Sequence, residues 1–295
     1  MTLEQMAITA KSPIPGFKTM LIGATGTGKT HSLCTLAEMG FEVFLLFTEP
    51  GHETVAKYFA EKGKEIPPNI HWQYVAPAAA DWSDMIDSAK KINTMSFEML
   101  TKLTDVNKRK YTEFIDILMA LSNFKDARTG VEYGPVDEMG TDCVIGLDSM
   151  SGLNLAAMNL VVGSKPVKGP ADWQTAMDNL ERLVTRLCMM QPHFVLTSHL
   201  EREKDEITGG EQLMASTLGR KLAPKIPRYF SDVIHVKRTG TKFEWSTDTP
   251  NADLKARNVK ISSTLPPDFK QIVLQWKKNG GEFRNKSGDL VEIKV

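Results

Sequence analysis

The 295-residue chain has little of several features that would assign it to a special class of protein. Its three cysteines, Cys34, Cys143 and Cys188, are widely spaced and form no CxxC pair, which excludes a disulfide framework and favours buried thiols in a reducing compartment. No apolar run reaches the roughly 18 residues of a membrane span. Residues 1–11 lack the basic-then-apolar pattern of a secretory signal. We therefore expect a cytoplasmic protein with no membrane segment.

The chain also lacks an excess of either charge. Its 36 Lys and Arg residues balance 36 Asp and Glu residues, so the formal net charge is zero. This balance argues against a protein coated in nucleic acid over its whole surface, but it leaves a local basic groove open. With 41% hydrophobic and 24% charged residues, the composition is that of an ordinary globular protein with one large domain or two small ones.

The most informative segment is the octapeptide GATGTGKT at residues 23–30, a complete phosphate-binding P-loop. Its glycines let the backbone turn tightly, so that N–H groups approach a phosphate chain. Lys29 supplies a positive charge for the β- and γ-phosphates, and Thr30 supplies a hydroxyl for Mg²⁺. A predicted strand precedes the loop and a predicted helix follows it, which places the positive end of a helix dipole beneath the phosphates. The predicted nucleotide-binding residues are Gly23, Ala24, Thr25, Gly26, Thr27, Gly28, Lys29, Thr30 and His31.

The residues around this loop also narrow the choice of nucleotide. A dinucleotide site is excluded because Gly28 is followed by Lys, Thr and His instead of the third glycine of that fingerprint. No base-reading Asn/Thr-Lys-x-Asp motif of GTP-binding proteins follows the loop. We therefore expect ATP, with Mg²⁺, as the bound cofactor.

Strands and helices alternate along the chain. Apolar runs predict strands, at residues 17–22, 41–47, 71–75, 143–147 and 194–197. Apolar residues at helical spacing predict helices, at residues 31–39, 81–92, 111–124 and 172–190. Residues 233–237 and 242–246 flank Gly240 and predict a late β-hairpin. This order is typical of an α/β fold with a mostly parallel central sheet flanked by helices.

Nucleotide hydrolysis needs a carboxylate in the Mg²⁺ shell, a group that activates water and positive charge near the γ-phosphate. Asp148 follows an apolar strand in the Walker B pattern, although such a residue can also cap the next helix. Glu49 follows the strand at 41–47 at the same predicted edge, either to orient or deprotonate the attacking water or as a solvated turn residue. His199 follows the strand at 194–197 and is a candidate for contact with the γ-phosphate. It has no His or Cys partner at ligand spacing, which argues against a zinc site.

Together these residues resemble the RecA-like ATPase core, over roughly residues 16–267. The closer resemblance is to phage-encoded, RecA-like nucleotide-binding proteins used in single-strand annealing and recombination. Besides the P-loop, it is carried by short motifs at 147–153, 172–173, 196–199 and 255–257. It implies a RecA-like domain over residues 1–267, with a helical insertion at about 81–140, and a small C-terminal appendage over 268–295.

The resemblance also implies roles for single residues. Glu49 takes the place of the catalytic glutamate, with Lys29 on the phosphates, and Asp148 joins Thr30 in the Mg²⁺ shell. His199 stands where RecA proteins carry a γ-phosphate-sensing Gln, which is a departure from the family pattern. Two further residues, Lys255 and Arg257, resemble basic residues that reach the nucleotide of a neighbouring subunit, which implies a homo-oligomer, either ring or filament.

A basic stretch follows the strand that ends before His199. Residues 201–216 are polar, and Gly209-Gly210 predicts a hinge in a loop over the strand edges. From residue 211 to 242 there are seven basic residues against two acidic ones, a composition that suits a phosphate backbone as well as a solvated surface. The candidate DNA-binding residues are Arg220, Lys221, Lys225 and Arg228.

The sequence thus predicts an ATP- and Mg²⁺-dependent RecA-like ATPase that binds single-stranded DNA in recombination, annealing or repair. A phage origin would place it in the host cytoplasm, and a single-strand-binding protein or another recombination protein is an expected partner. Three alternatives remain open. They are a ring-shaped helicase or packaging motor, a nucleotide-switched loader with little hydrolysis, and a nucleotide or small-substrate kinase, for which the arginine-rich lid is missing.

Overall fold

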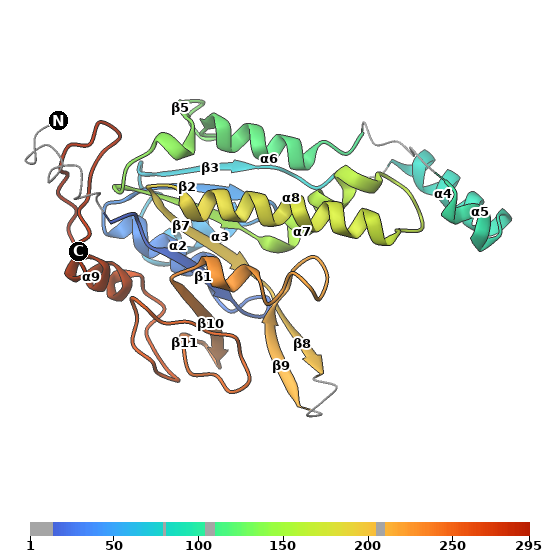
Figure 1. Ribbon diagram of the computed structural model, residues 1–295. Helices are drawn as coiled ribbons and strands as arrows, with labels where there is room; N and C mark the ends of the chain where they lie inside the picture. The colour runs from blue at the N-terminus through green and yellow to red at the C-terminus, as the bar shows by residue number, and fades with distance from the viewer. Residues whose placement is uncertain (1–13, 79–80, 104–109, 205–209) are drawn as a thin grey trace, which may run out of the picture.

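The computed structural model describes residues 14–78, 81–103, 110–204 and 210–295. The expectations for residues 1–11 and for Gly209 lie outside this part of the chain. Within it, the central sheet has seven strands in the order β11-β10-β1-β7-β6-β2-β3 (Figure 1). The strands are β1 (Lys18–Ile22), β2 (Glu42–Phe47), β3 (Ile70–Tyr74), β6 (Cys143–Asp148), β7 (His193–Ser198), β10 (Asp232–Thr239) and β11 (Lys242–Ser246).

The direction of these strands confirms the predicted fold class. Neighbouring strands are parallel from β10 through to β3. Only β11 is antiparallel, and it forms with β10 the late hairpin that the sequence predicted. The protein is therefore an α/β fold with a mostly parallel sheet, and the strands that carry the P-loop, Glu49, Asp148 and His199 all end at the same edge.

Helices cover both faces of the sheet because both faces are apolar. On β1, Met20 and Ile22 face one hydrophobic core, which the sheet shares with α6 (Glu113–Ser122), α7 (Met150–Val162) and α8 (Pro170–Met189). The intervening Leu21 faces the second core. That core contains residues of α2 (Lys29–Glu38), α3 (His52–Glu61) and α9 (Lys270–Lys278).

The structure corrects the expectation of a loop over residues 201–216. This stretch forms an antiparallel hairpin of β8 (Leu200–Lys204) and β9 (Glu211–Ala215) outside the main sheet (Figure 1). Its charged side chains suggested a loop, but they pair across the strands, with Arg202 and Glu211 3.3 Å apart. The side chains of this hairpin are mostly exposed or only partly buried, so its strands lack the apolar alternation that reveals a strand in the sequence.

Other elements have no clear pattern in the sequence because they are short or carry few apolar residues. Residues 124–140 contain β5 (Glu132–Gly134), paired with β4 (Phe124–Lys125), and the 3₁₀ turn η2 (Val136–Glu138). Helix α3 buries only Val55, Tyr58 and Phe59. A further 3₁₀ turn, η3 (Ile226–Tyr229), precedes β10.

The proposed domain boundaries stay predictions, but the packing of the segments is clear. Helices α4 (Trp82–Thr94) and α5 (Phe97–Thr101) extend away from the body (Figure 1), and α4 buries none of its side chains. Helix α6, from the same expected insertion, belongs to the core through Phe114 and Ile117. Helix α9 contributes Ile272 and Trp276 to the second core, so residues of 268–295 share a core with the sheet.

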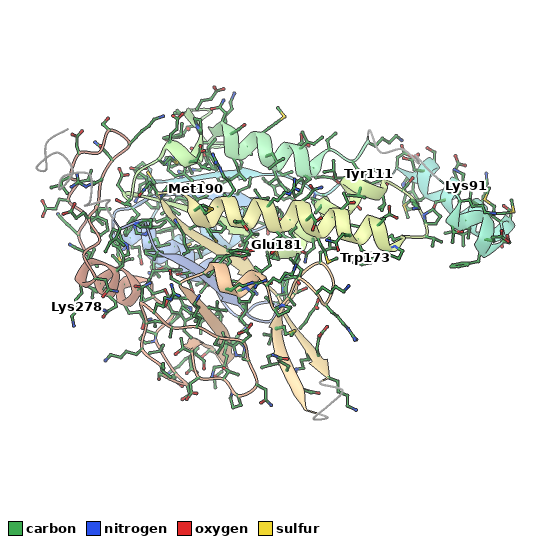
Figure 2. The ribbon with its side chains drawn as sticks, in the orientation of Figure 1. Lys91, Tyr111, Trp173, Glu181, Met190 and Lys278 are labelled. Carbon is green, nitrogen blue, oxygen red and sulfur yellow. The ribbon has the colours of Figure 1, made fainter. Side chains whose placement is uncertain are left out.

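Lys18 is a buried cation at the start of β1, away from the P-loop. It is 4% exposed, and its Nζ donates to the carbonyl oxygen of Met190 at 2.8 Å and to that of Pro192. Figure 2 shows Met190 at the end of α8, whose last carbonyl groups have no partner inside the helix. Burial lowers the pKa of Lys18 to about 8, and the nearby Cys188 acts in the opposite direction.

We expect this burial to make the free energy of unfolding rise between pH 8 and 10.5. In that window the unfolded chain holds the Lys18 proton, because the ordinary pKa is 10.5, while the folded chain has lost it. The rise is about 3 kcal/mol at most. Denaturant unfolding of the unmodified protein and of Lys18→Met across this pH range separates the contribution of Lys18 from those of tyrosines and cysteines, which both proteins share. If the difference between their free energies of unfolding stays constant over this range, the prediction is wrong.

Candidate nucleotide-binding site

The ends of four parallel strands surround one cavity at the P-loop edge of the sheet. The cavity has a volume of about 400 Å³. Residues 25–31 form one wall, and Glu49, Asp148 and His199 line another. The structure therefore brings together the residues that the sequence placed at three separate strand ends.

The P-loop has the backbone conformation that its glycines permit. Gly26 and Gly28 have φ angles of 73° and 94°, in the region that favours glycine. Lys29 lies across the loop, and its Nζ donates to the carbonyl oxygens of Gly23 at 2.8 Å and Ala24 at 2.9 Å. Burial lowers the pKa of Lys29, and the charges of nearby carboxylates, Asp148 foremost, counteract this effect. The ammonium is thus held at the loop where the phosphates of a nucleotide would lie.

Asp148, at the end of β6, is held by two threonine hydroxyls. Thr30 donates to Oδ2 at 2.6 Å, and Thr197 on β7 donates to Oδ1 at 2.5 Å. Burial raises the pKa of this carboxyl, whereas the two hydrogen bonds and Lys29 act to lower it. The cap of α7 is Ser149, whose Oγ accepts from the N–H of Ser151, so Asp148 does not serve as the helix cap.

A hydroxyl and a carboxylate in this arrangement fit a magnesium ion. Mg²⁺ prefers oxygen ligands and is usually held by one or two protein groups together with water and substrate phosphates. Thr30 and Asp148 supply such oxygens beside the P-loop. In the described part of the chain, no three or more His, Cys, Asp or Glu side chains form a group that could hold a metal ion.

Glu49 and His199 contact each other beside Asp148. Ser149 donates from Oγ to Glu49 Oε1 at 2.9 Å, and the other carboxylate oxygen lies 3.6 Å from His199 Nε2. The opposite ring nitrogen of His199 lies 3.5 Å from the Thr25 hydroxyl. Glu49 is partly exposed to the cavity, with 41% of its side chain accessible. It can therefore reach a water molecule there, and Ser149 fixes its orientation.

Several residues in or next to the cavity were not predicted from the sequence. Thr197 and Ser149 do not line the cavity, but they hydrogen-bond to Asp148 and Glu49, which do, and their position next to a motif was the only available signal. Lys57 of α3 and the hairpin residues Arg238 and Phe243 line the cavity. These three had no local signal, because they belong to elements that reach the P-loop only through the fold.

Lys255 and Arg257 lie away from the P-loop of their own chain. Lys255 pairs through its backbone with Val233 near the start of β10, whereas the P-loop edge is at the other end of that strand. Its Nζ donates to the carbonyl oxygens of Phe230 at 2.6 Å and Arg228 at 3.3 Å. Burial lowers its pKa. A contact of either residue with nucleotide would therefore need a second subunit.

The four candidate DNA-binding residues differ in their partners. Arg220 lies 3.3 Å from Glu203 of the β8–β9 hairpin, and Lys225 lies 3.4 Å from Glu181 on α8, a residue labelled in Figure 2. The other two, Lys221 and Arg228, are exposed and form no ion pair with a described residue. They are the side chains best placed to meet phosphate oxygens.

Comparisons with known proteins add little to this geometry. The sequence matches no protein-family model and no curated protein. Among solved structures, the fold is similar to that of the RadB recombinase, with 11% sequence identity over 83% of this chain and 86% of that chain, and a TM-score of 0.34. A similarity this low does not identify what the chain binds. None of the helices in the described residues combines the length and the apolar character that a membrane span requires.

Proposed function

We propose that the protein is an ATP- and Mg²⁺-dependent RecA-like ATPase that acts on single-stranded DNA in recombination, annealing or repair. One observation carries the ATPase proposal. Around a single cavity, the P-loop lies beside a buried Asp148 that is hydrogen-bonded to Thr30, with Glu49 3.6 Å from His199 on the adjoining wall. This set contains each group that nucleotide hydrolysis requires.

In the proposed mechanism, the backbone N–H groups of the P-loop and the Lys29 ammonium bind the phosphates. Thr30 and Asp148 would hold Mg²⁺, which would supply positive charge to offset that of the phosphates. Glu49, oriented by Ser149, aligns a water molecule for in-line attack on the γ-phosphorus and accepts its proton. The bond between the γ-phosphorus and the oxygen that bridges it to the β-phosphate breaks, and ADP and phosphate leave.

The DNA proposal rests on the resemblance in sequence and on the position of the β8–β9 hairpin. This hairpin begins directly after His199, and the N–H of Ser216 at its far end donates to the His199 carbonyl oxygen at 2.8 Å. A displacement of His199 in the cavity would therefore shift the base of the hairpin. Oligomer formation, with Lys255 and Arg257 acting in trans, and a phage origin follow from the resemblance alone.

The experiment that tests this function measures ATP hydrolysis with Mg²⁺, with and without single-stranded DNA, while the number of subunits is recorded under each condition. We expect hydrolysis that requires Mg²⁺ and rises with DNA. Strand unwinding or translocation would favour a ring motor instead. Nucleotide binding without turnover would favour a loader, and phosphate transfer to a small acceptor would favour a kinase.

Neutralising Lys221 and Arg228 together should weaken single-stranded DNA binding and lower its dependence on salt. Each lost phosphate contact reduces the magnitude of the slope of log K against log salt concentration by about 0.7. The slope of the double variant should therefore be smaller by about 1.4. Fluorescence anisotropy at several salt concentrations measures the slope. The matched control neutralises Lys270 and Lys278, two exposed lysines of α9. If the slope falls equally in both double variants, the change in net charge explains the weaker binding, and Lys221 and Arg228 are not specific DNA contacts.

A further inference from the structure

A second group of side chains lines the same cavity on the side of the P-loop away from Asp148. In the sheet order, β7, β6 and β2 lie on one side of β1, and they bring His199, Asp148 and Glu49. Strands β10 and β11 lie on the other side and bring Arg238 and Phe243. The cavity therefore has a hydrolytic end and, across the P-loop, a second end that the mechanism does not use.

Phe243 packs directly on the phosphate-binding loop. A Cβ at position 28 would lie only 2.7 Å from Cγ of Phe243, so only glycine fits beneath this ring. The ring is half-buried, and His31 meets it edge-on with ring centroids 5.1 Å apart. One part of the ring thus supports Gly28, while another part faces the cavity.

Arg238 lies over the same ring. Its Cζ is 5.9 Å from the ring centroid, and its Nε donates to the carbonyl oxygen of Gly240 in the hairpin turn at 2.9 Å. This bond restricts the orientation of the guanidinium, which lines the cavity. A flat cation this close to an aromatic ring forms with it a surface suited to a planar, electron-rich ring system.

We infer that Phe243 and Arg238 bind the base of the nucleoside triphosphate, with Phe243 as the stacking platform. The inference rests on the proposed function, because it takes the polyphosphate to lie on the P-loop with its γ-phosphate toward Asp148. The nucleoside must then extend from the opposite end of the loop, where the hairpin residues lie. Affinity for ATP therefore includes a stacking contribution that a bare polyphosphate does not receive.

The alternative is that Phe243 only supports the P-loop through Gly28. Two ligands separate these roles, since ATP carries a base and inorganic tripolyphosphate does not. Two variants separate them further, because Phe243→Leu keeps an apolar group over Gly28 without an aromatic face, and Phe243→Tyr keeps the face. Loss of base stacking costs about 1–3 kcal/mol, which corresponds to an increase of about 5- to 150-fold in the dissociation constant.

The test is calorimetric titration of the full chain and both variants with each ligand in the presence of Mg²⁺. We expect Phe243→Leu to bind ATP about tenfold more weakly while its affinity for tripolyphosphate changes by less than about twofold. Phe243→Tyr should bind both ligands as the unmodified protein does. An unchanged midpoint of thermal unfolding in Phe243→Leu confirms that the fold is intact.

Two results would overturn the inference while leaving the proposed function standing. In the first, Phe243→Leu loses affinity for both ligands equally, which would assign the ring to support of the P-loop. In the second, Phe243→Leu binds ATP with unchanged affinity, which would place the base elsewhere. If the unmodified protein fails to bind ATP at all, the proposed function falls, and this inference falls with it.

Discussion

Glu49→Gln should abolish most ATP hydrolysis while ATP still binds. The amide keeps the shape of the side chain and can still take part in the contact with Ser149, but it cannot accept a proton from water. Loss of a positioned general base lowers turnover by about 10²–10⁴-fold. Steady-state phosphate release and equilibrium binding of ATP, measured on the same preparation, check both parts of this prediction.

Glu53→Gln is the matched control for this variant. Glu53 lies in the first turn of α3, four residues beyond Glu49, is exposed and does not line the cavity. Its neutralisation changes the net charge by the same amount and should leave turnover unaltered. If Glu49→Gln hydrolyses ATP at the rate of the unmodified protein, the assignment of Glu49 as the catalytic base is wrong and another cavity residue activates the water.

Asp148→Asn should remove Mg²⁺-dependent hydrolysis without loss of stability. The amide is a poor ligand for Mg²⁺, so turnover should fall by at least about 10²-fold. Burial raises the pKa of Asp148, because removal from water disfavours the ionised carboxylate relative to the neutral form. The variant should therefore be as stable as the unmodified protein or more so.

The pH dependence gives this prediction a second readout. A folded-state pKa above the unfolded value stabilises the protein at acidic pH, and this contribution is lost as the pH rises through the folded pKa. The stability of the unmodified protein relative to Asp148→Asn should thus increase as the pH falls toward 3.8, the ordinary pKa of an aspartate. The control is Asp142→Asn, which changes the residue directly before the start of β6 and should retain hydrolysis. Full turnover in Asp148→Asn would exclude Asp148 from the Mg²⁺ shell.

Much of the hydrolytic end could be anticipated because each residue there stands next to a strong local pattern. The P-loop is a contiguous motif, and Glu49, Asp148 and His199 each follow an apolar run that predicts a buried strand. Parallel strands end at one edge, so the pattern also predicted their convergence. The β8–β9 hairpin was missed because its charged residues show no periodicity, although they pair across two strands.

The sequence by itself determined the P-loop motif, the α/β class and the positions of Glu49, Asp148 and His199 at strand ends, since all of these depend on neighbouring residues along the chain. Only the tertiary structure decided the order of the strands. It places β7 between β1 and β6, so that Thr197 meets Asp148, and it places β10 and β11 on the far side of β1. Phe243 thereby reaches Gly28 across more than 200 residues of sequence. Such a contact is set by the packing of side chains between whole elements, which no local pattern of residues records.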